Sequence, residues 1–300
     1  MKTLPGNVLE TSSLHHQLLK MSDTFTDAGK YNRTPAQAPT TSGCASADSS
    51  EPGVIKEISC YDMSGEKYLT IFNHYCYKNT KYFHYKKPQS RIGTNEDVIK
   101  LTKTFKDMDY KVTCHENMDY GEIMNKIIEI SKQDHTATSC LCFVFLTHGL
   151  KGGDLFAADR PYQFRDVTTL LENGHASLVG KPKIFIVQAC RGDQIDSGRK
   201  MAIDGPEVSI NIPTHADFLV LYSSVESFVS YRNKEGSFLV QELCDVIEEY
   251  HKQWDMLHII TLVQRRVAYY RTTFAPANPS IHDKKQMPET RFTLTKLFYL

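Results

Sequence analysis

The sequence predicts an α/β protein, specifically a three-layer α/β/α sandwich in which helices cover both faces of a mostly parallel, six-stranded sheet. Apolar runs of strand length occur along the chain, and segments with apolar residues at helical spacing lie between them. A strand buried on both faces reads as an apolar run, and helices connect such strands in parallel sheets. The alternation therefore indicates a buried sheet between two helical layers.

The first elements are expected between residues 68 and 114. Residues 68–72 form a short apolar run rich in strand-forming residues. Thr94 is expected to cap a helix, with Asp97 completing a capping-box-like start. The buried stripe of this helix comprises Val98, Leu101, Phe105 and Met108. Residues 110–114 then form the second strand.

The middle of the chain repeats this order. Asp119 with Glu122 is expected to begin a second helix. The buried face of this helix comprises Ile123, Ile127 and Ile130. The uninterrupted apolar run 141–146 predicts a strand, and a short helix is expected at 165–172.

Three strands and two helices are expected in the remainder. The strands are 183–188, 217–222 and the final segment 291–300. One helix has its apolar face at Leu239, Leu243, Val246 and Tyr250, and the other at Ile260, Val263, Val267 and Tyr270.

The charge balance limits what this protein binds. The 300 residues include 35 basic and 35 acidic side chains, so no basic face for nucleic acid is expected. No apolar segment reaches the ~18 residues of a membrane helix, and the N-terminus lacks a secretory signal, so no membrane contact is expected. The eight cysteines are scattered without CxxC pairs, which predicts reduced thiols in a cytoplasmic protein and no metal site.

Two segments lack any period. Residues 1–53 are mostly Ser, Thr, Ala, Gly, Pro and Asp beyond Met21, so we expect a disordered tail. Residues 191–216 are rich in Gly, Pro and Asp, and a loop of this length inside a compact domain is typical of a functional segment. Residues 81–87 (KYFHYKK) mix basic and aromatic side chains, and we expect a loop near the rim of a cleft rather than a nucleic-acid patch.

Two reactive side chains follow buried strands. His148 comes after the run 141–146, and Cys190 comes after 183–188. The carboxyl ends of parallel strands meet at one edge of a sheet, so neighbouring strands would bring imidazole and thiol into one cleft. This is the requirement for nucleophilic catalysis by a thiol.

Several motifs strengthen this interpretation. Residues 188–192 read QACRG, which matches the QAC[RQG]G signature of caspases, and His148 precedes Cys190 by 42 residues. The other motifs, in chain order, are SRIGTNED (90–97), THGLKG (147–152), ADFLVLYSS (216–224), SYRNKEGSF (230–238) and HDKKQMP (282–288). Over residues 54–300 the sequence resembles the caspase family of cysteine proteases.

The resemblance implies a role for each site residue. Cys190 would be the nucleophile and His148 the general acid, with the backbone N–H groups of Gly149 and Cys190 forming the oxyanion hole. Arg91, Gln188 and Arg232 would bind the aspartate side chain before the cleaved bond, because guanidinium groups bind carboxylates bidentately. Further substrate contacts would come from Tyr231, Asn233 and Phe238. No cofactor is implied.

The resemblance also implies maturation by proteolysis. Asp196 and Asp204 are candidate cleavage sites, and Asp27 is a candidate for release of the tail. The expected parts are a propeptide (1–53), a large subunit (54–196), a linker (197–204) and a small subunit (205–300). The tail is too short for a six-helix recruitment domain, which favours the executioner type.

The implied partners are protein substrates with aspartate before the cut, an upstream activating caspase, a second copy in a homodimer and an inhibitor-of-apoptosis protein. The alternative is a catalytically inactive caspase homologue with a regulatory role, and the presence of the catalytic pair and both arginines argues against it. A flavodoxin-like nucleotide binder is disfavoured, because no glycine-rich phosphate loop follows the first strand.

Overall fold

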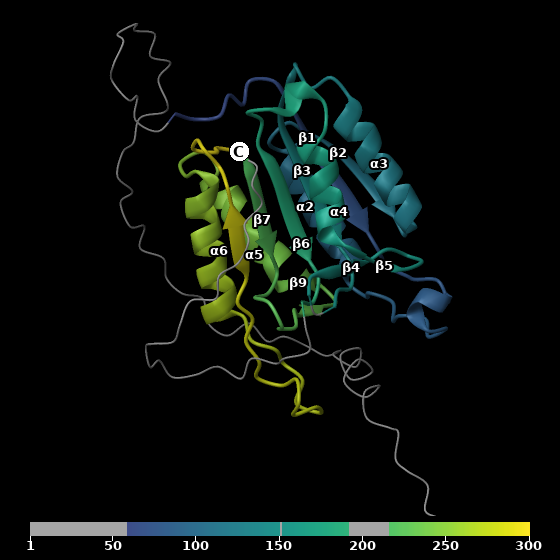
Figure 1. The fold of residues 1–300 in the computed structure, drawn as a ribbon. Coiled ribbons are helices and arrows are strands. Elements are labelled where there is room, and N and C mark those ends of the chain that lie inside the picture. Colours follow the sequence, from purple (N-terminus) through teal and green to yellow (C-terminus); the bar gives the residue numbers. More distant parts are fainter. Residues whose placement is uncertain (1–58, 151, 192–215) are drawn as a thin grey trace, which may run out of the picture.

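The computed structural model describes residues 59–150, 152–191 and 216–300, and its centre is a sheet of six strands (Figure 1). The strand order is β10-β7-β6-β3-β1-β2, and only the β10–β7 pair is antiparallel. The strands are β1 (Glu66–Asn73), β2 (Tyr110–Glu116), β3 (Thr138–Leu146), β6 (Lys183–Gln188), β7 (Phe218–Tyr222) and β10 (Glu289–Phe292). The mostly parallel six-stranded sheet is thus confirmed.

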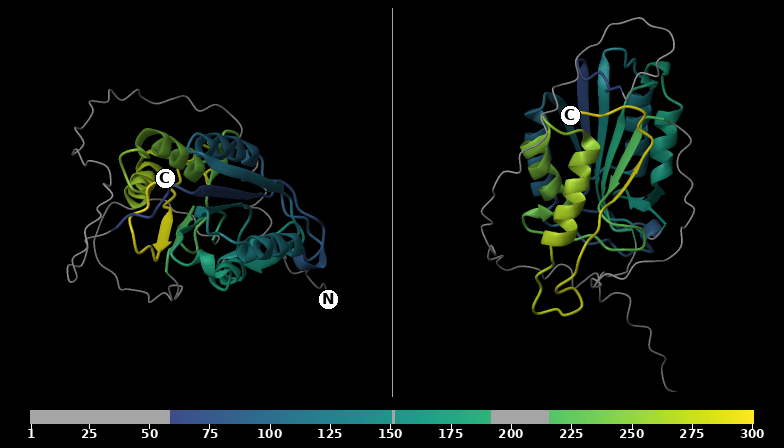
Figure 2. Two further views of the ribbon diagram at one scale, coloured as in Figure 1. Left: turned by 90° about the horizontal axis from the view of Figure 1, so that it is seen from above. Right: turned by 90° about the vertical axis from the view of Figure 1, so that its left-hand side faces the viewer.

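Helices cover both faces of the sheet, which confirms the three layers (Figure 2). One layer contains α2 (Thr94–Lys106), α5 (Phe238–Tyr250) and α6 (Met256–Tyr270), and the other contains α3 (Tyr120–Lys132) and α4 (Phe164–Glu172). The strands β1, β3, β6 and β7 supply alternate residues to two separate apolar cores, because successive side chains point to opposite faces.

Strand β3 illustrates this alternation. Every residue of β3 is buried. Cys140 and Cys142 face the layer of α2, α5 and α6, with their sulfur atoms 3.6 Å apart. Phe143 and Phe145 face the layer of α3 and α4. The two thiols are therefore core residues.

Helix starts depend on more than local sequence. Asp119 and Glu122 form the expected capping box at α3. At α2 the expectation is wrong, because the cap residue is Gly93, with φ of 86°, and Thr94 is already helical. The Thr94 hydroxyl donates to Asn73 and accepts from Arg91, so tertiary hydrogen bonds have taken the proposed capping group.

The last strand is shorter than expected. β10 ends at Phe292, whereas the prediction extended to residue 300. Beyond β10, Leu297 pairs with the segment around Cys60, and Phe298 is buried against Tyr61. These apolar residues serve the core through this N-terminal segment rather than as a continued strand.

The structure contains short elements that the sequence pattern does not signal. They are the 3-10 helices η2 (Lys81–Phe83) and η3 (Ala176–Leu178) and the hairpins β4 (Asp154–Phe156) with β5 (Pro161–Gln163) and β8 (Arg232–Asn233) with β9 (Gly236–Ser237).

Among the described residues no helix is long and apolar enough to cross a bilayer. Six of the seven described cysteines are free thiols, and Cys60 is disulfide-bonded, so the expectation of reduced thiols throughout is wrong there.

Candidate active site

Sheet register places His148 and Cys190 side by side. Strands β3 and β6 are parallel neighbours, and Leu146 pairs with Gln188. His148 and Cys190 each lie two residues beyond that pair, at the carboxyl end of the sheet. Gly149 confirms the proximity, since a Cβ atom there would lie 2.2 Å from the carbonyl oxygen of Cys190. Only glycine permits this approach of the two backbones.

The orientation of His148 is fixed by three groups. Its Nε2 atom donates to the carbonyl oxygen of Gln89 at 2.9 Å. The ring stacks on Tyr77 with centroids 5.1 Å apart, and the Tyr77 hydroxyl accepts from the backbone N–H of His148. Since a carbonyl only accepts, Nε2 carries a hydrogen, and Nδ1 is the atom that exchanges a proton with reacting groups.

Cys190 lies on a short, well-supported segment. The buried Ser223 hydroxyl donates to the carbonyl of Ala189 and accepts from its N–H, at 2.9 and 3.2 Å. The Cys190 sulfur is partly buried and lies 3.9 Å from both the carbonyl and the hydroxyl oxygen of Ser230. Ser230 therefore links the nucleophile to Gln188, whose amide donates to the same hydroxyl at 3.1 Å.

Arg91 is a buried cation with unused donors. The side chain is fully buried, and its Nη1 atom donates to the hydroxyl of Thr94 at 2.7 Å and, at 3.4 Å, to the carbonyl of His74. Within the described part of the chain, Nε and Nη2 have no hydrogen-bond partner. Burial lowers the pKa of Arg91 from its ordinary value. Buried donors without partners are energetically costly, so this guanidinium is suited to binding an anion.

Arg232 supplies a second cation to the same place. It lies on β8 and donates from Nε to the carbonyl of Ile92 at 2.8 Å, which fixes the direction of its guanidinium. Burial lowers the pKa of Arg232 to about 10, and repulsion from Arg91 adds to the effect. Two neighbouring guanidinium groups that repel each other form a site that attracts an anion.

Comparison with known proteins identifies the family. The caspase domain model matches residues 70–299. The chain is 36% identical to caspase drICE of Drosophila melanogaster over 76% of this chain and 67% of that protein. It is also 36% identical to caspase-3 of Xenopus laevis, over 74% and 77% of the two chains. The crystal structure of caspase-1 from Spodoptera frugiperda superposes with a TM-score of 0.72 at 33% identity, covering 82% of this chain and 94% of that one.

The chain belongs to the caspase family. It is accordingly a cysteine-type endopeptidase.

Sequence reasoning missed the role of Asp97 in this caspase. Asp97 is buried, and its Oδ1 atom accepts from the backbone N–H of Ser237 at 2.7 Å. Burial raises the pKa of Asp97 to about 6, although Ser237 and the arginines Arg91 and Arg232 act in the opposite direction. The carboxylate thus ties α2 to the hairpin that carries Arg232. The position of Asp97 in the motif SRIGTNED is the available signal, but the local pattern there indicates a helix cap.

The residues expected to extend the substrate site, Tyr231, Asn233 and Phe238, lie next to Arg232, at the hairpin β8–β9 and at the start of α5. Tyr231 and Phe238 are both buried, with ring centroids 6.3 Å apart. Asn233 is partly buried and accepts from the backbone N–H of Glu235 and from the side chain of Gln241. A Cβ on Gly93 would lie 2.2 Å from the Asn233 carbonyl, so the hairpin sits directly against the start of α2.

Arg191, which follows Cys190, is also buried. Its guanidinium pairs with Glu289 of β10, donates to the carbonyl of Ser224 and stacks over Tyr222 at 4.1 Å. These contacts couple the catalytic segment of the caspase to the edge strand.

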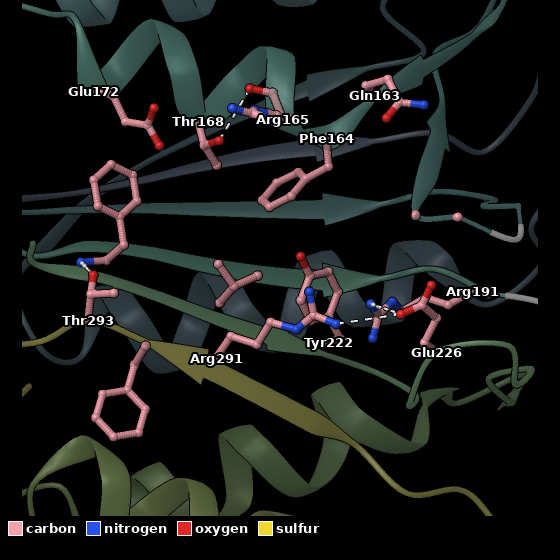
Figure 3. A pocket seen from close by; sticks show the side chains of 15 residues that line it. Gln163, Phe164, Arg165, Thr168, Glu172, Arg191, Tyr222, Glu226, Arg291 and Thr293 are labelled. Atoms are coloured by element: carbon pink, nitrogen blue, oxygen red, sulfur yellow. Dashed lines mark hydrogen bonds and ion pairs between the residues drawn. The ribbon is translucent and has the colours of Figure 1, made fainter. Parts of the chain in front are cut away.

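Arg191 also lines a cavity of about 450 Å³ on the sheet face beside α4 (Figure 3). Arg165, Glu226 and Arg291 contribute further charged side chains to its wall. The lining includes neither His148 nor Cys190. In the described ranges no cluster of three or more His, Cys, Asp or Glu side chains could hold a metal ion. The candidate cleavage sites Asp27, Asp196 and Asp204 lie outside the described residues.

Proposed function

We propose that this caspase hydrolyses peptide bonds after aspartate and is made as a zymogen that executes apoptosis by cleaving proteins at DxxD-like sites. The observation that carries the specificity is the buried guanidinium of Arg91, whose Nε and Nη2 donors have no partner among the described residues. A substrate carboxylate satisfies these donors and offsets the repulsion between Arg91 and Arg232.

Gln188 completes this pocket. It is buried, and its Oε1 atom has no partner within the residues that the structure describes. The Ser230 hydroxyl can donate as well as accept, so the amide can turn and direct its NH₂ group at the bound carboxylate. The pocket then offers donors from three side chains to one aspartate.

The proposed chemistry uses the neighbouring pair. The thiol proton of Cys190 resides on Nδ1 of His148 when the sulfur attacks the carbonyl carbon of the aspartate, and the oxyanion is bound by the N–H groups of Gly149 and Cys190. His148 protonates the leaving amine, which departs as the thioester forms. Water then attacks the thioester and gives a proton to His148, and the C–S bond breaks, which releases the carboxylic acid and restores the Cys190–His148 pair with its proton. The hydrogen bond from Nε2 to Gln89 holds the imidazole with Nδ1 available for both proton transfers.

We propose activation by cleavage between the large subunit (54–196) and the small subunit (205–300), with Asp196 cut before Asp204 and Asp27 cut to release the propeptide. Only the sequence DQID before Ser197 has acidic residues at both ends. An upstream caspase would make the first cut.

The proposed working form is a cytoplasmic homodimer. Strand β10 lies at the edge of the sheet, and an unpaired strand edge favours pairing with a second copy. Caspase relatives support protein substrates and dimeric assembly, and an inhibitor-of-apoptosis protein is a further candidate partner.

The test is a panel of tetrapeptide substrates that end in Asp, Asn or Glu before the reporter, assayed with the processed enzyme and with Cys190→Ala. We expect turnover of the Asp substrate alone and none by Cys190→Ala. Cys114→Ala is the control, because this exposed thiol of β2 should leave turnover unchanged. Equal turnover by the enzyme and Cys190→Ala would refute the proposal, and absence of turnover by both would favour the inactive-homologue alternative.

The cleavage order has its own test. Treatment of the Asp196→Ala variant with an upstream caspase should leave the large and small subunits joined in one chain of low activity. Asp204→Ala should be cut and activated like the unmodified chain. Full activation of Asp196→Ala through Asp204 would show that the Asp196 assignment is wrong.

A further inference from the structure

One surface beside the catalytic histidine has no role in the chemistry above. Residues 78–89, here named the rim loop, connect β1 to the segment that carries Arg91. The loop exposes three lysines, together with a histidine and two tyrosines: Lys81, Lys86, Lys87, His84, Tyr82 and Tyr85. Tyr85 is 72% exposed, although a tyrosine of a compact domain is ordinarily at least half buried.

The rim loop is held in a defined shape. Phe83 is buried against Phe156 with ring centroids 4.9 Å apart, and the Thr80 hydroxyl donates to the carbonyl of Asp159 at 2.6 Å. The Thr80 carbonyl accepts from the backbone N–H of Tyr85 at 2.9 Å. His84 and Tyr85 both have positive φ, 51° and 56°, which turns their side chains outward at a cost in backbone strain. The buried aromatic ring and the hydrogen bonds therefore hold the exposed side chains of the rim loop in a fixed arrangement.

The three lysines are not neutralised by neighbours. The nearby carboxylates are already used, since Asp119 pairs with Lys78 and Asp159 pairs with Arg160. In residues 59–150, 152–191 and 216–300, Lys81, Lys86 and Lys87 form no ion pair. Arg160 adds a cation to the same surface, where it stacks over the ring of Tyr82 at 4.1 Å. The rim loop therefore presents a local excess of positive charge on a chain with no net charge.

The position of the loop relative to the cleft follows from Gln89. Its carbonyl accepts from His148, so the loop ends in contact with the group that protonates the leaving amine. Lys87 is two residues away from Gln89, which places its Cα within about 7 Å of the Cα of Gln89. The hairpin β8–β9, with Arg232, is joined to α5, whereas the rim loop packs on β4 and the segment after it (Figure 1). The rim loop thus lies beside His148, the residue proposed to protonate the amine of the leaving segment.

We propose that the rim loop recognises acidic side chains that follow the cleaved bond in a protein substrate. This proposal rests on the proposed protease function and names a property of its substrates. An extended chain advances about 3.3 Å per residue, so side chains roughly three to five residues after the cut come within reach of the three lysines. Tyr82 and Tyr85 add apolar contact and hydroxyl donors between the charges.

The test compares processed enzyme on two quenched peptides that are identical up to the cut and continue with either three glutamates or three glutamines from the third residue after it. We expect kcat/KM to be about tenfold higher for the glutamate peptide at low salt. This preference should be lost at about 0.5 M salt, because salt screens interactions between exposed charges. The variant Lys81→Gln, Lys86→Gln, Lys87→Gln should cleave both peptides equally. Lys86→Glu with Lys87→Glu should reverse the preference.

Matched controls separate this proposal from general electrostatics. Lys106→Gln, Lys132→Gln, Lys252→Gln removes the same charge from exposed sites elsewhere and should retain the preference. A tetrapeptide with its reporter directly after Asp should be cleaved equally by all these enzymes. If no enzyme cleaves the tetrapeptide, the protease proposal fails. If cleavage is normal and the rim variant keeps the preference for glutamate, the rim proposal is wrong. Loss of oligouridylate binding by the rim variant, with peptide preference unchanged, would also overturn it in favour of a nucleic-acid surface.

Discussion

Asp97 of α2 accepts a hydrogen bond of 2.7 Å from the backbone N–H of Ser237, the residue that caps α5. The contact is so close that a Cβ on the intervening Gly236 would lie 2.4 Å from the same carboxylate oxygen. Helix α2 and the hairpin β8–β9 are thereby joined at one buried carboxyl group, which interacts electrostatically with Arg91 and Arg232.

The first prediction concerns this carboxylate. Because burial raises the pKa of Asp97 to about 6 from 3.8, the protonated form favours the fold, and its contribution is lost as pH rises through 6. Asp97→Asn keeps an acceptor for Ser237 without the charge. We expect the unfolding free energy of the variant to match that of the unmodified protein near pH 4 and to exceed it at pH 7 by on the order of 3 kcal/mol. Urea unfolding across this range measures the difference. Asp109→Asn, at an exposed site, should show no such pH dependence.

The second prediction concerns Gly149. A Cβ there would meet the Cys190 carbonyl at 2.2 Å and the Asp154 carbonyl at 3.0 Å, so Gly149→Ala must shift the backbone that is proposed to bind the oxyanion. We expect kcat/KM to fall by about 100-fold or more while the fold remains. Gly121→Ala has open space around its new methyl group and lies in α3, so it should stabilise the protein by about 0.5–1 kcal/mol with unchanged kinetics. Unimpaired Gly149→Ala would exclude this backbone from the oxyanion site.

The third prediction separates a guanidinium from a simple positive charge. Lysine at position 232 lacks the Nε donor that binds the carbonyl of Ile92 and cannot bind a carboxylate bidentately. We expect Arg232→Lys to lower kcat/KM on an Asp substrate by about 100-fold. Arg265→Lys, an exposed site of α6, serves as control and should be neutral. A loss of less than threefold at Arg232 would remove it from the substrate pocket.

The fourth prediction concerns the ion pair between Arg191, which follows Cys190, and Glu289 of β10. Glu289→Gln leaves the buried Arg191 guanidinium with Glu226 at 4.0 Å as its nearest remaining carboxylate. We expect a loss of about 2–4 kcal/mol in unfolding free energy and slower alkylation of Cys190 by iodoacetamide. In the double variant with Arg191→Met, the two losses should be less than additive. Strict additivity would show that the pair is not coupled.

The sequence was sufficient for the sheet because its strands are buried on both faces. Runs such as 141–146 and 183–188 read as strands without reference to tertiary structure, and register then brings His148 beside Cys190. The cap at Asp119 could be predicted because both partners of the capping box are local in sequence.

Other features depend on residues distant in sequence and were beyond a local pattern. Thr94 resembles a cap, but Arg91 and Asn73 bind its hydroxyl. Asp97 serves a residue 140 positions away. The apolar end of the chain reads as a strand, whereas Leu297 and Phe298 pack against the segment around Tyr61. In each case long-range packing decides the role of a side chain whose neighbours suggest another.

The parallel pairing of β6 with β7 has a consequence for any break between Arg191 and Ala216. Lys183 pairs with Phe218, so the end of β6 and the start of β7 lie at opposite poles of the sheet, about 20 Å apart. A cut in that connection leaves the ladder between the two strands closed. The pieces on either side are interlocked halves of one sheet, and separately expressed halves should therefore find each other and complement into a single folded unit.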